Sequence, residues 1–328
     1  TITSTVYIFQ RNQTGVEAWG LVKQLVGPAS SQFGYAIDLD GNTLVVGAPH
    51  SDSGFPFNTA DTGAAYVYDR NTGGADNWGQ IGLLPLADTP YNEYAATGDR
   101  WGTTVAVDGD VIAIGGPGVY NIGQQVSNAG GVLAYIRPHN STGWQQLGGV
   151  QGDFADHAFG AGLALSGDTL AVGADDSSNG PGAVYIYQRN TGGQMLGWTK
   201  TITVAGAGQA VGFGRIVRLD GETLAVVSRN PNVLSTDQIN LFGRNIGGAD
   251  NWGGLYTLPV SNGLSIQLWQ DTLVASLGTE AQIRLRYEGG QNQWGLMQTL
   301  PVTFANSMAL GEETLVLGYA DGRQSFEV

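Results

Sequence analysis

The stretch FGAGLALSGDTLAVGA, residues 159–174, contains the main structural signal of the chain, and after DDSSNG it continues as PGAVYIYQRNTGGQMLGWTKTITV to Val204. The alternation of small and apolar residues in FGAGLAL and GAVYIY predicts strands, and the apolar run TLAVGA predicts a strand buried on both faces. The glycine-containing SGD turn between apolar runs is typical of a β-hairpin, whose central residues need positive φ. With the extended run GWTKTITV, the stretch predicts a four-stranded antiparallel sheet with strands A, B, C and D.

The same unit recurs along the whole chain. Its A–B segments align without a gap from Phe33, Trp101, Phe159 and Phe213, and two degenerate copies start at Asn262 and Phe304. Repeats of about 40–60 residues that each form a four-stranded sheet predict a β-propeller, because stacked sheets bury faces that one sheet cannot bury alone. One Trp stands near the start of each strand D, where we expect packing between sheets, with ligand stacking as the alternative. These residues are Trp19, Trp78, Trp144, Trp198, Trp252 and Trp294.

We expect a single all-β propeller domain over residues 1–328. It would consist of a half-blade at 1–27, units at 33–87, 101–149, 159–205, 213–259 and 262–300, and a closing blade that pairs 304–328 with 1–27. This arrangement favours six blades. The segment GRQSFEV, 322–328, resembles a further strand C, which leaves seven blades as the alternative. Because the chain starts at Thr1 inside an expected strand C, we expect a mature or excised piece of a longer protein.

Between Phe33 and Tyr68 the segments FG, TLVVGAP and GAAYVY resemble the FG-GAP repeat of the integrin α-subunit propeller, in its bacterial surface and secreted version. The resemblance covers nearly the whole chain and is weaker in the last two copies. It implies an extracellular or cell-surface propeller. Many members of the family carry a D-x-D-x-D-G calcium loop in the A–B turn. No turn here has that motif, and two-residue hairpins leave no room for the oxygen ligands of Ca²⁺, so these calcium sites are not carried over.

Composition narrows the classes of partner. The net charge is −14, which argues against nucleic acid and against anionic membranes, both of which attract Lys and Arg. No apolar stretch is long enough to insert into a membrane. The chain has no Cys, so it offers no thiolate ligand or Cys nucleophile. The expected partners are therefore a protein, including a second copy that pairs with open strands at the termini, or a glycan.

No catalytic constellation is evident, and we predict that the chain is not an enzyme. The three histidines, His50, His139 and His157, occupy positions that do not recur in the repeat, and no catalytic motif is present. Carboxylates in the loops after strand B suggest one hypothesis, a Ca²⁺ held with backbone carbonyls, and solvated loop acids are the alternative. These carboxylates belong to Asp52, Asp61, Asp175 and Asp176.

The B–C and D–A loops of a propeller emerge on one face, and two of these loops are long here. Exposed aromatic side chains suit protein or sugar contacts. The predicted binding surface comprises Phe55, Phe57, Tyr91, Tyr94, Trp101 and Tyr120. The sequence thus predicts a non-catalytic extracellular module for binding, adhesion or self-assembly. A glycan-binding propeller and an accessory domain of a larger secreted enzyme are the alternatives.

Overall fold

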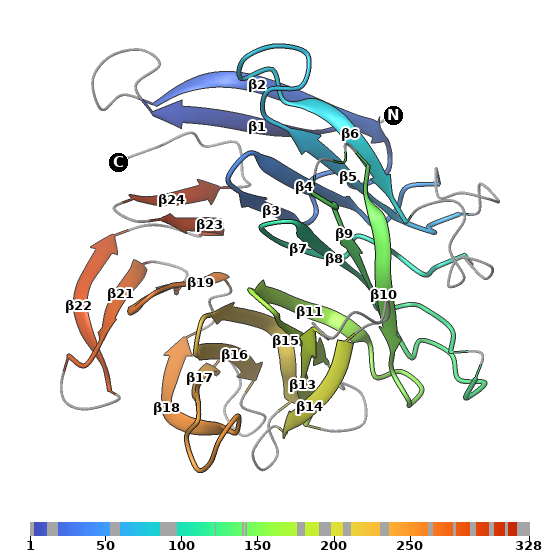
Figure 1. Ribbon diagram of the computed structural model, residues 1–328. Helices are drawn as coiled ribbons and strands as arrows, with labels where there is room; N and C mark the ends of the chain where they lie inside the picture. Colours follow the sequence, from blue (N-terminus) through green and yellow to red (C-terminus); the bar gives the residue numbers. More distant parts are fainter. Residues whose placement is uncertain are drawn as a thin grey trace. The chain divides into compact units, whose positions relative to one another are not determined.

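The computed structural model describes most of the chain. The described residues are 3–11, 19–52, 60–85, 97–121, 123–139, 141, 143–175, 181–189, 198–205, 211–229, 236–261, 265–277, 280–288, 293–301, 305–311 and 314–319. All regular elements in these ranges are β-strands, as predicted (Figure 1). The chain divides into two compact units, 1–174 with 187–201 and 175–186 with 202–328.

The strands form four-stranded antiparallel blades in the chain order A, B, C, D. Blade one contains β3 (Ile37–Asp40), β4 (Thr43–Ala48), β5 (Ala64–Asp69) and β6 (Gly79–Leu84). Blade two contains β7 (Thr104–Asp108), β8 (Val111–Gly116), β9 (Gly131–Ile136) and β10 (Gln145–Gln151). Blade three contains β11 (Phe159–Ser166), β12 (Thr169–Ala174), β13 (Ala183–Arg189) and β14 (Trp198–Ala205).

The second half of the chain repeats this order. Blade four contains β15 (Val211–Asp220), β16 (Thr223–Arg229), β17 (Thr236–Arg244) and β18 (Trp252–Ser261). Blade five contains β19 (Ser265–Trp269), β20 (Thr272–Ser276), β21 (Glu280–Arg286) and β22 (Trp294–Pro301). Two further hairpins are β1 (Thr3–Arg11) with β2 (Trp19–Ala29), and β23 (Ala305–Gly311) with β24 (Thr314–Tyr319). Five complete blades and two half-blades fit a count of six.

The A–B turns are two-residue hairpins, as the sequence predicts. Asp40 pairs with Thr43 and Asp108 with Val111, and the same spacing holds in the other four A–B hairpins of the described strands. Gly41 has φ 53°, which an L-residue reaches only at a steric cost. Glycine is therefore favoured at this turn position, although Gln270 adopts φ 49° at the equivalent position of blade five.

The hydrophobic core lies between successive sheets. In the first unit, residues of blades one and two share one cluster of buried side chains, and blades four and five share another in the second unit. The predicted packing role of the strand D tryptophans is confirmed where their side chains are described. Trp78, Trp144, Trp198, Trp252 and Trp294 are buried. The side chain of Trp19 lies outside the described residues.

Glycines allow the backbones of neighbouring blades to touch. A Cβ added to Gly63 would lie 2.2 Å from the carbonyl oxygen of Trp101, and one added to Gly47 would lie 2.0 Å from that of Gly102. Gly63 also forms an isolated parallel bridge with Trp101. The same bridge recurs between Gly130 and Phe159 and between Gly182 and Phe213. The glycines of the repeat therefore serve close approach between blades.

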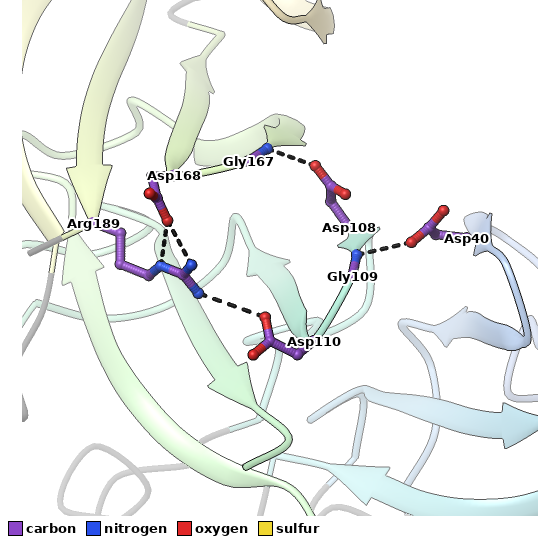
Figure 2. Close-up of polar contacts among 7 residues, drawn as sticks. All are labelled: Asp40, Asp108, Gly109, Asp110, Gly167, Asp168 and Arg189. Carbon is purple, nitrogen blue, oxygen red and sulfur yellow. Dashed lines mark hydrogen bonds and ion pairs between the residues drawn. The ribbon is translucent and has the colours of Figure 1, made fainter. Parts of the chain in front are cut away.

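Aspartates at the ends of two A strands tie successive blades together. Asp40 accepts a hydrogen bond from the backbone N–H of Gly109 (2.8 Å), and Asp108 accepts one from that of Gly167 (2.5 Å), as Figure 2 shows. Each carboxylate thus satisfies an amide in the A–B turn of the next blade. Hydrogen bonds to a charged group are stronger than neutral ones, so these contacts hold the turns in register.

An arginine strengthens the same face of the first unit. Arg189, at the end of β13, donates from Nε to Asp168 Oδ1 (2.6 Å), and its Nη1 lies 3.6 Å from Asp110 Oδ1 (Figure 2). Because Asp110 belongs to the turn of blade two, Arg189 links two successive turns. Asp110 and Asp168 are thus both engaged by the Arg189 guanidinium.

The hairpin β1–β2 packs against blade one. Val6 and Leu25 are buried in the same cluster as residues of β4 and β5, and Lys23 Nζ donates to Asn77 Oδ1 (2.9 Å). This packing fits the half-blade predicted for 1–27. Closure by pairing of the terminal strands stays a prediction. Residues 320–328, on which the seven-blade alternative depends, lie outside the described residues.

Candidate functional site

Two loops of blade two form a hydrogen-bonded surface on the side of the B–C and D–A connections. One segment follows β8 and the other follows β10. The N–H groups of Asp156, Ala158 and Phe159 donate to the carbonyl groups of Ser127, Asn128 and Ala129 at 3.1, 3.3 and 3.1 Å. Asp156 and Ala158 have φ of 58° and 46°, so the second loop coils tightly against the first. The backbone contacts give the surface a defined shape.

Asn121 holds the loop that follows β8 against the loop that follows β10. Its Nδ2 donates to the carbonyl oxygen of Gly152 (2.7 Å), and its backbone exchanges hydrogen bonds with Val126 at 3.0 and 3.1 Å. The preceding Val119 belongs to the core shared by blades one and two. Tyr120 stands between these two buried residues and is 41% exposed. Its position is therefore fixed by the backbone on both sides.

Phe154 projects from the second loop and is 58% exposed. Its ring lies 4.9 Å from the His157 ring, centroid to centroid, at 47°. Asp153 and Asp156 are exposed on either side, and Asp156 Oδ1 accepts a hydrogen bond from Asn128 Nδ2 (2.9 Å). We call the segments 118–121, 123–130 and 152–158 the loop platform. Its exposed side chains include two aromatic rings, Tyr120 and Phe154, and two carboxylates, Asp153 and Asp156.

The structure changes the predicted binding surface in one respect. Trp101 is 5% exposed and packs in the core of blades one and two, so its placement on the surface is corrected. The reason is its register, since Trp101 stands where the other repeats have the buried Phe of FG. Tyr120 is exposed as expected. The remaining predicted residues, Phe55, Phe57, Tyr91 and Tyr94, lie outside the described residues.

Sequence reasoning missed Phe154. The segment GDFADHA, 152–158, connects a strand D to the next strand A and has no periodic pattern. The signal in the sequence is a single Phe between acids in such a connection. This signal is ambiguous, because an apolar residue in a short loop faces either the core or solvent. Only the structure separates these two outcomes.

Two of the predicted metal-ligating acids lie together. Asp61 Oδ1 lies 2.7 Å from His50 Nδ1, and the Asp61 N–H donates to Asp52 Oδ1 (3.0 Å). Both oxygens thus already have a polar partner in the protein. Among the residues that the structure describes, no three His, Asp or Glu side chains gather as a metal site. Asp175 follows β12, and Asp176 lies outside the described ranges. Calcium at the four carboxylates stays a prediction.

Shifted pKa values occur within blades and away from the platform. Burial, reinforced by the nearby Tyr66, raises the pKa of Tyr68 to about 12. Burial lowers the pKa of the Arg284 guanidinium, and Tyr256 acts in the opposite direction. Arg284 donates to Gln282 Oε1 and to the Trp294 carbonyl oxygen. Both shifts follow from packing inside blades.

Comparison with known proteins supports the architecture. Residues 26–68 match the family model of the FG-GAP repeat. The matched segment runs from β2 to β5 and contains the FG pair and the glycines that approach blade two. No curated protein matches the chain. The match confirms the predicted resemblance over these residues, and with the repeated four-stranded sheets it identifies a β-propeller.

Solved structures share the fold. The chain resembles a candidate 6-phosphogluconolactonase from Bacteroides fragilis with a TM-score of 0.53 and 11% identity, over 91% of this chain and 78% of that chain. It also resembles one from Bacteroides uniformis with a TM-score of 0.49 and 13% identity, over 91% and 92% of the two chains. The first likeness, at such low identity, shows the fold alone.

FG-GAP repeats are typical of extracellular proteins. In the part of the chain that the structure describes, no helix has the length and hydrophobicity needed to span a membrane.

Proposed function

We propose that this β-propeller is a non-catalytic module, displayed on the cell surface or secreted, that binds a protein partner on the loop platform. The observation that carries the proposal is the pair of exposed aromatic residues, Tyr120 and Phe154, on loops that are joined by backbone hydrogen bonds. Large aromatic side chains dominate protein interfaces.

The fixed backbone of the platform favours binding. Ordering a loop at an interface costs free energy, and a loop already held in one conformation avoids much of that cost. Asn121, which fixes one of the two loops, bonds to Gly152 of the other. The two aromatic residues therefore belong to one preformed surface.

The A–B turns lie on the face opposite the loop platform. Their acids support a structural role for that face. Asp40, Asp108 and Asp168 engage amides or Arg189 within the first unit. Groups used in this way hold the turns in place. The proposed division is a turn face that maintains the sheets and a loop face that meets the partner.

A selection from a random peptide library displayed on phage tests the proposal. Wild-type protein is compared with the double variant Tyr120→Ser and Phe154→Ser. Tyr287→Ser is the matched control, because Tyr287 is also exposed but lies in blade five. We expect peptides that bind the wild type and the control and fail to bind the double variant.

If every enriched peptide binds the double variant as well as the wild type, the platform is not the binding surface. Thermal unfolding of all three proteins checks that the exposed substitutions leave the fold intact.

A further inference from the structure

The loop platform carries acidic and aromatic side chains, and its one basic side chain is the imidazole of His157, which lies against the Phe154 ring. Residues 118–130 and 152–158 contain Asp153 and Asp156 and no Lys or Arg. Both acids are exposed, and they stand one residue before and two residues after the exposed Phe154 in the sequence. A surface of this kind attracts cations through its carboxylates and through the negative faces of its rings.

Elsewhere in the protein, an arginine contacts both an aromatic ring and a carboxylate. The Arg137 guanidinium lies 5.5 Å from the centre of the Trp144 ring, and its Nη1 lies 3.9 Å from Asp69 Oδ2. In blade five, Arg286 lies 5.0 Å from the Tyr287 ring, with Nη1 3.7 Å from Asp271 Oδ1. Each of these sets combines an arginine, an aromatic ring and a carboxylate.

The platform offers two members of that set. Phe154 and Tyr120 supply rings, and Asp153 and Asp156 supply carboxylates. The complementary third member is a guanidinium or an ammonium group brought by another molecule. Arg suits this position better than Lys because its planar group both stacks on a ring and pairs with a carboxylate.

We propose that the loop platform binds a basic segment of a partner protein, with Arg or Lys side chains over Phe154 or Tyr120 and their charge against Asp153 and Asp156. This inference rests on the proposed function and names the chemistry of the partner. The net charge of −14 favours the approach of such a segment, since long-range attraction speeds association with cations.

Fluorescence anisotropy with two labelled peptides of equal length tests the inference. One peptide alternates Gly and Arg, and the other alternates Gly and Gln. We expect the Arg peptide alone to bind the wild type, and its affinity to fall as salt rises, because exposed charge pairs are screened.

Charge-matched variants separate the platform from the general acidity of the protein. The double variant D153N/D156N removes two charges from the platform, and E222Q/E288Q removes two exposed charges from blades four and five. We expect the first to weaken binding of the Arg peptide by about tenfold and the second by less than about twofold. Phe154→Ser should weaken it by about fivefold.

The outcomes distinguish this inference from the proposed function. Equal losses in the two double variants would mean that net charge alone attracts the peptide, which overturns the inference. Platform-dependent phage peptides without Arg or Lys would overturn the inference and leave the protein-binding function in place. A glycan array bound by the wild type and lost with Phe154→Ser would overturn it in favour of sugar recognition. Absence of any platform-dependent peptide would overturn the proposed function itself.

Discussion

The first strands of blades one and two occupy equivalent positions, yet their apolar side chains have different environments. In β7, Val105 and Val107 are 8% and 6% exposed, whereas in β3 the aligned Ile37 and Leu39 are 49% and 55% exposed. The β7 residues pack with Val45 and other residues of blade one. A strand A is therefore buried mainly by the blade before it, and among the described strands of the first unit the hairpin β1–β2 alone precedes β3 in the chain.

The largest expected effect is the difference between Val107→Asn and Leu39→Asn. The Val107 substitution removes buried methyl groups and introduces an amide without partners, so it should lower the free energy of unfolding by about 3 kcal/mol. The Leu39 substitution should cost less than about 0.5 kcal/mol if that side chain remains exposed. Urea unfolding of the two variants measures the difference.

A large loss of stability in Leu39→Asn would contradict the exposure of this side chain. It would mean that β3 is covered in solution, as the predicted pairing of the terminal strands requires. Ile37→Asn should then behave in the same manner, because Ile37 and Leu39 point to the same side of the strand.

The repeat pattern was enough to predict the strands, the two-residue turns and the buried tryptophans, because these depend on local spacing. Contacts between blades were harder to predict from the sequence. Asp38 and Asp40 could be placed on one face of a strand, but their partners, the N–H groups of Val107 and Gly109, are 69 residues away. Nothing in the local sequence identifies an amide at that separation.

The candidate site was harder to predict than the fold. Its residue type and loop neighbours place Trp101 on the surface, whereas its alignment with Phe33 and Phe159 indicates the core, where the structure has it. Tyr120 was identified correctly as exposed. Phe154 was missed, because the direction of a side chain in a short loop depends on backbone contacts such as those of Asp156 with Ser127.

The glycine contacts between blades give the second prediction. Gly63 has φ 81°, and its added Cβ would lie 2.2 Å from the Trp101 carbonyl oxygen. Gly63→Ala therefore combines backbone strain with a backbone clash, and we expect a loss of about 2–3 kcal/mol. Gly41→Ala is the control, because Gly41 has φ 53° and open space around it, and it should cost about 1 kcal/mol. Equal losses in urea unfolding would remove close approach as the reason for Gly63.

The aspartate contacts between turns give a smaller effect. Asp108→Ala leaves the Gly167 N–H without its carboxylate at an exposed turn, so we expect a loss of about 1 kcal/mol. Asp108→Asn keeps an oxygen acceptor and should lose less than half of that amount. Asp40→Ala should resemble Asp108→Ala, since its contact with Gly109 has the same form. If the Ala and Asn variants at 108 unfold at the same urea concentration, the hydrogen bond does not stabilise the junction.

The smallest effect on the free energy of unfolding at neutral pH is expected for Tyr68→Phe. This variant tests a difference between blades one and two that appears only at alkaline pH. Burial and Tyr66 raise the pKa of Tyr68 from 10.0 to about 12, while the residue aligned with Tyr66 in blade two is Leu133. The folded state holds the phenolic proton more tightly than the unfolded state. The resulting stabilisation is complete below pH 10.0 and is lost as pH rises toward about 12. Urea unfolding across this interval should show a steeper decline for wild type than for Tyr68→Phe. Parallel declines would mean that Tyr68 titrates alike in both states, because the other tyrosines are common to the two proteins and cancel in the difference.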